Sequence, residues 1–245
     1  MPIARKRGSS SEGELKGSFD GAQRGPIYER LMNAIAEHRL HPGTKLAEDR
    51  LAAIFGVSRT VVRAVLQQLS HELVVTIVPN RGAFIASPTV EEARELFEAR
   101  RQIELPIVEK VCRSATKKDI ALLRAHVARE QEARKRDDRR TAVRLSGEFH
   151  VLLAHLGGNR FIERTMRGLQ MLTCLTILLY DAPTSQACPH DEHGCLIDAI
   201  EDGSVKLAQK LMVEHLAHIE ASLRLHAPEE EEDDLEAILL RGASS

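Results

Sequence analysis

The sequence has few aromatic side chains: Phe, Tyr and Trp make up 3% of its 245 residues, and Trp is absent. Its hydrophobic content of 43% still allows substantial cores, which must then be built from Leu, Ile, Val and Ala. Cores of this kind favour helices over a β-sandwich or a β-barrel. At about 150 residues per domain, the length is typical of two modest domains. We therefore expect a mainly α-helical protein with two domains.

Other features that the sequence lacks indicate in which cellular compartment the protein is found. No hydrophobic run approaches the roughly 18 residues of a transmembrane helix. The basic N-terminus has no apolar stretch of the kind found in secretory signals. The four cysteines show no spacing typical of a disulfide framework, which favours free thiols in a reducing cytosol. We expect a cytoplasmic protein that makes no membrane contact.

The net charge of −2 is unevenly distributed along the chain. Residues 1–87 contain 12 Lys and Arg against 8 Asp and Glu, whereas residues 88–245 contain 22 against 28. A basic first third joined to an acidic remainder is typical of a nucleic-acid-binding module attached to another domain. The acidic excess is concentrated between Glu229 and Glu236, so we interpret residues 228–245 as a solvated acidic tail.

The first part of the chain has the element order of a winged helix-turn-helix domain. Residues 1–25 are aperiodic and rich in Gly, Ser and charge, and we expect a disordered arm there. The domain is expected to span residues 26–87 and to begin at Pro26, a favourable first residue of a helix. Apolar spacing and turn residues predict three helices and then a β-hairpin: a helix ending before 41, helices over 47–55 and 59–69, and strands over 73–78 and 83–86.

The predicted third helix has the side chains that a DNA recognition helix needs. Its aliphatic residues share one face, and its basic and hydroxyl side chains point to the other side. Arg can donate two hydrogen bonds to guanine, while Ser and Thr can reach phosphate. Gly at the tip of the predicted wing lets the backbone approach the duplex closely. The expected DNA contacts lie at the start of this helix and at the wing tip: Ser58, Arg59, Thr60, Arg63, Arg81 and Gly82.

This region resembles the GntR family of bacterial transcription regulators from about residue 27 to residue 86. The resemblance rests on Gly-Val-Ser-Arg-Thr-Val-Val-Arg-Ala-Val-Leu-Gln-Gln-Leu, preceded by Pro-Gly-Thr-Lys-Leu and followed by Pro-Asn-Arg-Gly-Ala-Phe. It implies that Arg59, Thr60 and Arg63 contact operator DNA together with the wing glycine. Some members have another DNA-contacting Arg early in the second helix, and Asp49 stands at that position here. A homodimer would place two recognition helices on a palindromic site in double-stranded DNA.

Residues 88–227 are predicted to form an all-helical domain. Caps and periodicity predict helices over 90–113, 117–136, 138–156, 160–180, 191–201 and 204–225. The segment from about 91 to 223 resembles the FCD effector-binding domain found in the fatty-acid-regulator-like branch of the GntR family. The match includes Glu-Leu-Phe-Glu-Ala-Arg-Arg-Gln-Ile-Glu near its start and Leu-Met-Val-Glu-His-Leu near its end. The resemblance implies an antiparallel helical bundle that binds an effector in a central cavity and mediates dimerisation.

Three histidines in this domain are expected to point into the bundle. His150, His193 and His215 share helical faces with aliphatic residues on three different predicted helices. Three inward imidazoles can converge on one divalent cation, such as Zn²⁺ or Ni²⁺, with a coordination position left open. The resemblance implies a site of one Asp and three His, but Ser146 stands where the Asp is expected. Either an effector carboxylate completes a three-histidine metal site, or the imidazoles bind an anion without metal.

Arg100 and Glu104 lie one helical turn apart. In the family an Arg at this place often faces the ligand cavity. The alternative is an i,i+4 pair on the helix surface, worth a few tenths of a kcal/mol. The expected effector-binding residues are therefore Arg100, Ser146, His150, His193 and His215.

These features predict a ligand-responsive repressor of a catabolic operon, released from its operator by a small organic acid. Two alternatives remain. A metal-dependent enzyme would use the three histidines, although the sequence has no His-Glu-x-x-His, no ordered Ser/His/Asp set and no phosphate-binding Gly loop. A DNA-binding dimer without a sensing role would use the bundle for dimerisation alone.

Overall fold

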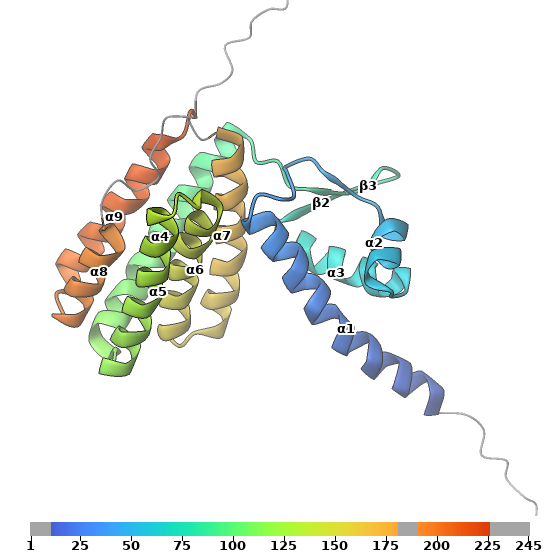
Figure 1. Cartoon of the computed structure of the whole chain (residues 1–245), viewed down its shortest axis with the longest axis horizontal. Helices are drawn as coiled ribbons and strands as arrows, with labels where there is room; N and C mark the ends of the chain where they lie inside the picture. The colour runs from blue at the N-terminus through green and yellow to red at the C-terminus, as the bar shows by residue number, and fades with distance from the viewer. Residues whose placement is uncertain (1–10, 181–190, 226–245) are drawn as a thin grey trace, which may run out of the picture.

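A computed structural model describes residues 11–180 and 191–225 of the chain. Figure 1 shows a helical bundle on one side and a smaller domain of helices and short strands on the other. The predicted fold class is confirmed: the protein is mainly α-helical, with a winged helix-turn-helix region followed by a bundle. The predicted acidic tail at 228–245 and the first ten residues of the predicted arm lie outside the described residues.

The first helix starts earlier than the sequence predicts. Helix α1 spans Ser11–Ala36, so the expected disordered arm is wrong over residues 11–25. Pro26 lies inside this helix and does not begin it. The Gly and Ser residues of this segment favour disorder, but the Glu, Leu and Lys residues among them favour a helix. From Ile27 onward, α1 packs its apolar face into the core of the small domain.

Helices α2 (Glu48–Phe55) and α3 (Arg59–His71) form the helix-turn-helix. The turn between them depends on Gly56, whose φ of +64° is a left-handed conformation that glycine adopts without strain. Ser58 then caps α3 by accepting a hydrogen bond from the backbone N–H of Val61, as predicted. The apolar face of α3 is buried through Val61, Val62, Val65, Leu66 and Leu69.

The wing is a three-stranded antiparallel sheet in the order β1-β3-β2. Strands β2 (Val75–Val78) and β3 (Gly82–Ile85) pair as the predicted hairpin, with Val78 opposite Gly82. The sequence analysis missed β1 (Lys45–Leu46), a two-residue strand that pairs with Phe84 and Ala83 of β3. Leu46 points into the core while Lys45 stays exposed, which follows from the two-residue period of a strand.

The bundle consists of α4 (Val90–Ser114), α5 (Lys117–Lys135), α6 (Arg139–Leu156), α7 (Arg160–Tyr180), α8 (Glu192–Glu201) and α9 (Val205–Ser222). Capping boxes start α4 and α5, with Thr89 paired to Glu92 and Thr116 paired to Asp119. The core between the helices is almost entirely aliphatic, as the low aromatic content predicts. No described helix combines the length and the hydrophobicity that crossing a bilayer requires.

Helix α7 joins the two domains. Leu175 of α7 is fully buried in the hydrophobic core of the small domain, among side chains of α1, α3 and the sheet. Gly168 allows this close approach, because a Cβ at that position would lie 3.1 Å from the backbone oxygen of Glu72, just after α3. The hydroxyl of Tyr28 on α1 donates a 2.6 Å hydrogen bond to the Glu72 carboxylate. The bundle therefore contacts the DNA-binding module directly through α7.

Candidate functional site

The start of α3 presents a cluster of polar side chains to solvent. Ser58, Arg59, Thr60 and Arg63 are all exposed, with 58% and 56% of the two arginine side chains accessible. The opposite face of the helix is buried. This arrangement leaves the arginines available to the edges of bases in a major groove.

Both arginines of α3 form ion pairs with the start of α2. Arg63 donates two hydrogen bonds to Glu48, at 3.0 and 2.7 Å. Arg59 lies 3.5 Å from Glu48 and 3.0 Å from Asp49. Glu48 thus holds the two arginines side by side and raises the pKa of Arg63 through their hydrogen bonds. The sequence analysis missed this role of Glu48, which is 15 residues away from Arg63 in the chain.

The wing tip adds further positive charge. Arg81 is exposed in the turn, and its guanidinium carbon lies 5.9 Å from the centre of the Phe84 ring. Lys45 on β1 lies at the same distance from that ring. Gly82 has a φ of +103°, a conformation that L side chains rarely adopt. Lys45 is a cation that the sequence analysis did not assign to the wing, because its pairing with β3 depends on the fold.

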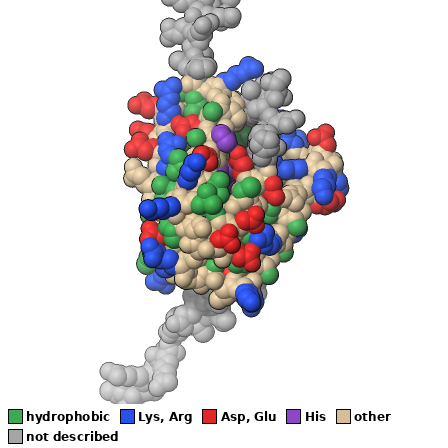
Figure 2. Space-filling view, turned by 90° about the vertical axis from the view of Figure 1, so that its left-hand side faces the viewer, with side chains coloured by type: hydrophobic (Ala, Val, Ile, Leu, Met, Phe, Trp, Pro, Cys, Tyr) green, Lys and Arg blue, Asp and Glu red, His purple; other side chains and the backbone are tan. Residues whose placement is uncertain are grey.

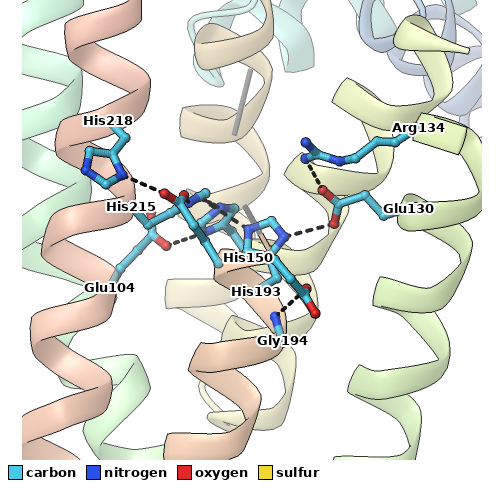
Figure 3. Close-up of polar contacts among 10 residues, drawn as sticks. Glu104, Glu130, Arg134, His150, His193, Gly194, His215 and His218 are labelled. Atoms are coloured by element: carbon cyan, nitrogen blue, oxygen red, sulfur yellow. Dashed lines mark hydrogen bonds and ion pairs between the residues drawn. The ribbon is translucent and has the colours of Figure 1, made fainter. Parts of the chain in front are cut away.

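The three histidines of the bundle meet, as the sequence predicts (Figure 3). His150 lies on α6, His193 on α8 and His215 on α9, and each is at most 5% exposed. The Nε2 atom of His215 lies 3.1 Å from that of His150 and 3.3 Å from that of His193. One ring nitrogen from each histidine lies within 4.8 Å of the others, so the three form a single site.

A different glutamate contacts the outer nitrogen of each imidazole. The Nδ1 atom of His150 lies 2.5 Å from Glu104, that of His193 lies 2.8 Å from Glu130, and that of His215 lies 2.7 Å from Glu192. These glutamates come from α4, α5 and α8. We call the three histidines and three glutamates the His–Glu centre.

The protonation of these groups decides what the site presents to a ligand. Burial raises the pKa of Glu104, but Arg100 and His150 outweigh that effect and bring it to about 2. Burial lowers the pKa of His150 to about 4 and that of His215 to about 3. A neutral imidazole has one N–H, and an ionised carboxylate can only accept a hydrogen bond. The proton of His150 therefore lies on Nδ1, and its Nε2 presents a lone pair.

Because the glutamates contact the Nδ1 atoms, the Nε2 atoms of all three histidines face one another. A cation bound among them would meet three nitrogen ligands. The charge balance agrees, since Glu104 pairs with Arg100 and Glu130 with Arg134, whereas Glu192 contacts only the histidines 215 and 218 among the described residues. Imidazoles that donate their other N–H to carboxylates are the usual ligands of zinc and related metals. The residues present therefore fit a divalent cation.

Arg100 is a buried part of this centre. Neither it nor Glu104 is more than 2% exposed, so the alternative of a pair on the helix surface is wrong. The two pack inside the bundle because the same face of α4 buries Phe97, Ile107 and Val108. Arg100 donates hydrogen bonds to Glu104 at 2.7 Å and to Thr173 of α7 at 3.2 Å. Its Nη2 atom has no hydrogen-bond partner within the described part of the chain.

Ser146 is half-buried one turn before His150 on α6, and it is not among the residues whose ligand atoms converge. The carboxylates of the centre come from other helices. The sequence analysis missed Glu130 as a partner of His193. A signal was present, because Glu130 shares a helical face with Val127 and Ala133 and is buried with them.

The His–Glu centre approaches the surface on the side of α8 and α9. His218 is 59% exposed and lies 2.5 Å from Glu192, which also contacts the buried His215. Figure 2 views the bundle from this side and shows histidine among acidic and hydrophobic side chains.

Comparison with known proteins assigns both parts of the chain. Residues 23–85 match the family model described as bacterial regulatory proteins, gntR family, and residues 95–218 match the FCD domain. The Uxu operon regulator of Haemophilus influenzae is 27% identical over 80% of this chain and 80% of that protein. The HTH-type transcriptional repressor RspR of Escherichia coli is 22% identical over 81% of this chain and 87% of that protein.

A solved structure supports the same assignment. A transcriptional regulator of the GntR type from Rhodococcus sp. RHA1 superimposes with a TM-score of 0.71 and 25% identity, covering 82% of this chain and 96% of that one. The matched families and relatives are transcriptional regulators, so the enzyme alternative is wrong. The chain belongs to the GntR family of bacterial transcriptional regulators and carries an FCD domain.

Proposed function

We propose that this regulator is a repressor of a catabolic operon, and that a small organic acid bound at the His–Glu centre releases it from DNA. It acts as a homodimer on a palindromic operator, in the cytoplasm where the bacterial chromosome lies. The convergence of three Nε2 atoms backed by three glutamates carries the proposal. The names of two relatives, an operon regulator and a repressor, support the repressor assignment.

DNA recognition is assigned to the first turns of α3 and to the wing. Arg59 and Arg63 contact base edges in the major groove, while Ser58 and Thr60 reach phosphates. Arg81 and Gly82 contact the sugar-phosphate backbone of the DNA or the adjacent minor groove. The exposure of these side chains supports this assignment.

Effector binding is assigned to the His–Glu centre and Arg100. His150, His193 and His215 would hold Zn²⁺ or Ni²⁺, which would supply a Lewis-acid position for a carboxylate of the effector. The free Nη2 of Arg100 would donate a hydrogen bond to the same anion. Ser146 leaves the space of the missing Asp to the effector, one turn from His150. The buried, charge-balanced setting of the histidines supports binding of a cation and an anion together.

A continuous set of contacts connects the effector site with the DNA-binding domain. His150 contacts Glu104, Glu104 contacts Arg100, and Arg100 donates to Thr173 of α7. Two residues further along α7, Leu175 is buried in the core of the winged-helix domain. A ligand that moves Arg100 would thereby shift α7 and the recognition helix, and change the match to operator half-sites.

Metal analysis and ligand screening together test this proposal. Purified protein should contain close to one equivalent of divalent metal per chain, and small carboxylates should raise its melting temperature and release it from its own promoter region. Metal-free protein that is stabilised by carboxylates would refute the metal and leave the histidines as a direct anion site. Metal-loaded protein that responds to no carboxylate would favour the dimerisation-only alternative.

A further inference from the structure

A cavity lies between the two domains, away from the His–Glu centre. It has a volume of about 570 Å³ and is bounded by α1 of the winged-helix domain and by α5, α6 and α7 of the bundle. None of the three histidines of the centre lines it, and neither does Arg100. Its volume is in the range of cavities that bind small organic molecules, roughly 300–1,000 Å³.

Two buried polar atoms at this cavity make no hydrogen bond within the described part of the chain. Gln170 of α7 is 7% exposed, and its Oε1 accepts no hydrogen bond within the described part of the chain. The Nε of Arg144 on α6 is also buried without a hydrogen bond among the described residues, and it lies 3.9 Å from the Glu37 carboxylate. Buried polar groups in native proteins are nearly always paired, so the unpaired Oε1 of Gln170 indicates that a partner is missing from the cavity.

Gln170 is held in place by the neighbouring helix. A Cβ on Gly147 of α6 would lie 2.1 Å from the Gln170 amide nitrogen, so only glycine leaves room for this side chain. The amide nitrogen also lies 3.8 Å from the sulfur of Cys174. The amide is thus packed closely against α6 at the wall of the cavity.

The charges around the cavity favour an anion. Three arginines line it, Arg129, Arg144 and Arg167, against two acids, Glu29 and Glu148. Arg144 is paired with Glu148 and also lies 3.9 Å from Glu37, and Arg167 is paired with Glu163 outside the lining. Arg129 takes part in none of the ion pairs among the described residues. The unbalanced positive charge at the cavity is therefore that of Arg129 on α5.

The rest of the lining is apolar. Met32 of α1, Leu152 of α6 and Met171 of α7 face the cavity, and methionine adapts its shape to bound apolar groups. We propose that this interdomain cavity binds an amphipathic hydroxy-carboxylate. Its carboxylate pairs with Arg129 and Arg144, its hydroxyl donates to Gln170 Oε1, and its hydrocarbon body packs against the apolar lining.

The position of the cavity gives such a ligand a regulatory effect. Arg144 lies 3.9 Å from Glu37, directly after α1, so the anion site adjoins a contact between the two domains. A molecule that touches both Met32 and Met171 ties α1 to α7. It would therefore restrict movement of the winged-helix domain against the bundle. This consequence for DNA binding rests on the proposed function, whereas the binding itself does not.

Calorimetric titration of the full-length protein tests the site with 3-hydroxydecanoate, decanoate and 1-decanol as probes. The hydroxy acid should bind most tightly and the uncharged alcohol most weakly. Ala125→Phe places a ring in the cavity from an exposed position of α5, and should weaken both acids by at least about tenfold. Ala121→Phe, one turn earlier on the same exposed face and outside the lining, is the matched control and should bind like the wild type.

Two further variants separate this site from the His–Glu centre. Arg144→Gln should weaken decanoate but not decanol, while Arg140→Gln on the same helix changes neither. His193→Ala should leave decanoate binding intact. The proposal is overturned if no probe binds the wild type up to about 5 mM, if Ala125→Phe binds as tightly as Ala121→Phe, or if His193→Ala abolishes binding. These results do not depend on metal or operator binding, so they distinguish failure of this site from failure of the proposed function.

Discussion

The guanidinium of Arg100 and the hydroxyl of Thr173 form a buried hydrogen bond, 3.2 Å long, between α4 and α7. The Thr173 hydroxyl in turn donates to the backbone oxygen of Leu169 at 2.9 Å. This threonine is the link between the His–Glu centre and the helix that enters the core of the winged-helix domain.

Replacing this threonine should weaken the connection between ligand and DNA. Thr173→Val leaves a buried guanidinium N–H without an acceptor, and should reduce the free energy of unfolding by about 1–3 kcal/mol. The protein should keep its metal but require more effector to leave the operator. Urea denaturation and effector titrations of a gel shift measure the two effects. Thr173→Ser retains the hydroxyl and should behave as the wild type; equal responses of the two variants would remove Thr173 from the coupling.

Arg63→Ala should weaken operator binding by at least about tenfold, because a side chain facing the major groove no longer contacts a base. The dependence of affinity on salt should also become shallower if a phosphate contact is lost. Fluorescence anisotropy with a labelled promoter fragment measures both. Arg160→Ala removes an equally exposed arginine from the bundle and is the control. Unchanged affinity in Arg63→Ala would show that α3 does not enter the groove as proposed.

Asp49→Asn should strengthen DNA binding several-fold. The Asp49 carboxylate lies 3.0 Å from Arg59, where it both occupies that arginine and repels phosphates. The asparagine keeps the size of the side chain and removes the charge. Asp202→Asn, at the turn between α8 and α9, makes the same charge change far from the recognition helix. Weaker binding by Asp49→Asn would mean that the carboxylate positions Arg59 for its DNA contact.

Glu130→Gln should lower metal affinity by about 10–100-fold, because a neutral amide orients His193 less strongly and reduces its basicity. Competition with a chelator measures the affinity. Glu132→Gln, two residues further along α5 and exposed, is the matched control. If both variants bind metal as the wild type does, the contact between Glu130 and His193 is structural only.

His193→Ala should remove bound metal and the effector response together while leaving operator binding largely unchanged. The histidine is 5% exposed and lies in the bundle, far along the chain from α3. Metal content by atomic emission and effector-dependent release in a gel shift measure the two losses. A variant that loses metal yet still responds to effector would separate the two proposed roles of the site.

Local sequence signals predicted α3 and the hairpin closely. Ser58 caps the helix that follows it, and the Pro-Asn-Arg-Gly turn joins strands whose pattern is local. Strand β1 was not predicted because Lys45 and Leu46 form a strand only through their pairing with Phe84 and Ala83. The start of α1 was predicted too late in the chain because Pro26 is a favourable first residue of a helix, whereas in the structure it lies inside α1.

The histidines could be found from the sequence because each shares a helical face with buried aliphatic residues. Their glutamate partners could not be paired from the sequence, since Glu104 is 46 residues from His150 and Glu130 is 63 residues from His193. The helical spacing of Arg100 and Glu104 fits a surface pair as well as a buried one. The pair is buried because this face of α4 lies inside the bundle. That burial depends on how the neighbouring helices pack, which the sequence of α4 alone does not show.

The burial of Leu175 couples the stabilities of the two domains. Because one helix supplies side chains to both cores, neither domain can unfold without exposing apolar surface that belongs to the other. Free energy gained when a ligand binds in the bundle is then distributed to the winged helix as well. The DNA-binding module of this protein is accordingly not an independent unit attached by a tether, and separating it at the linker between the domains would leave it without part of its own interior.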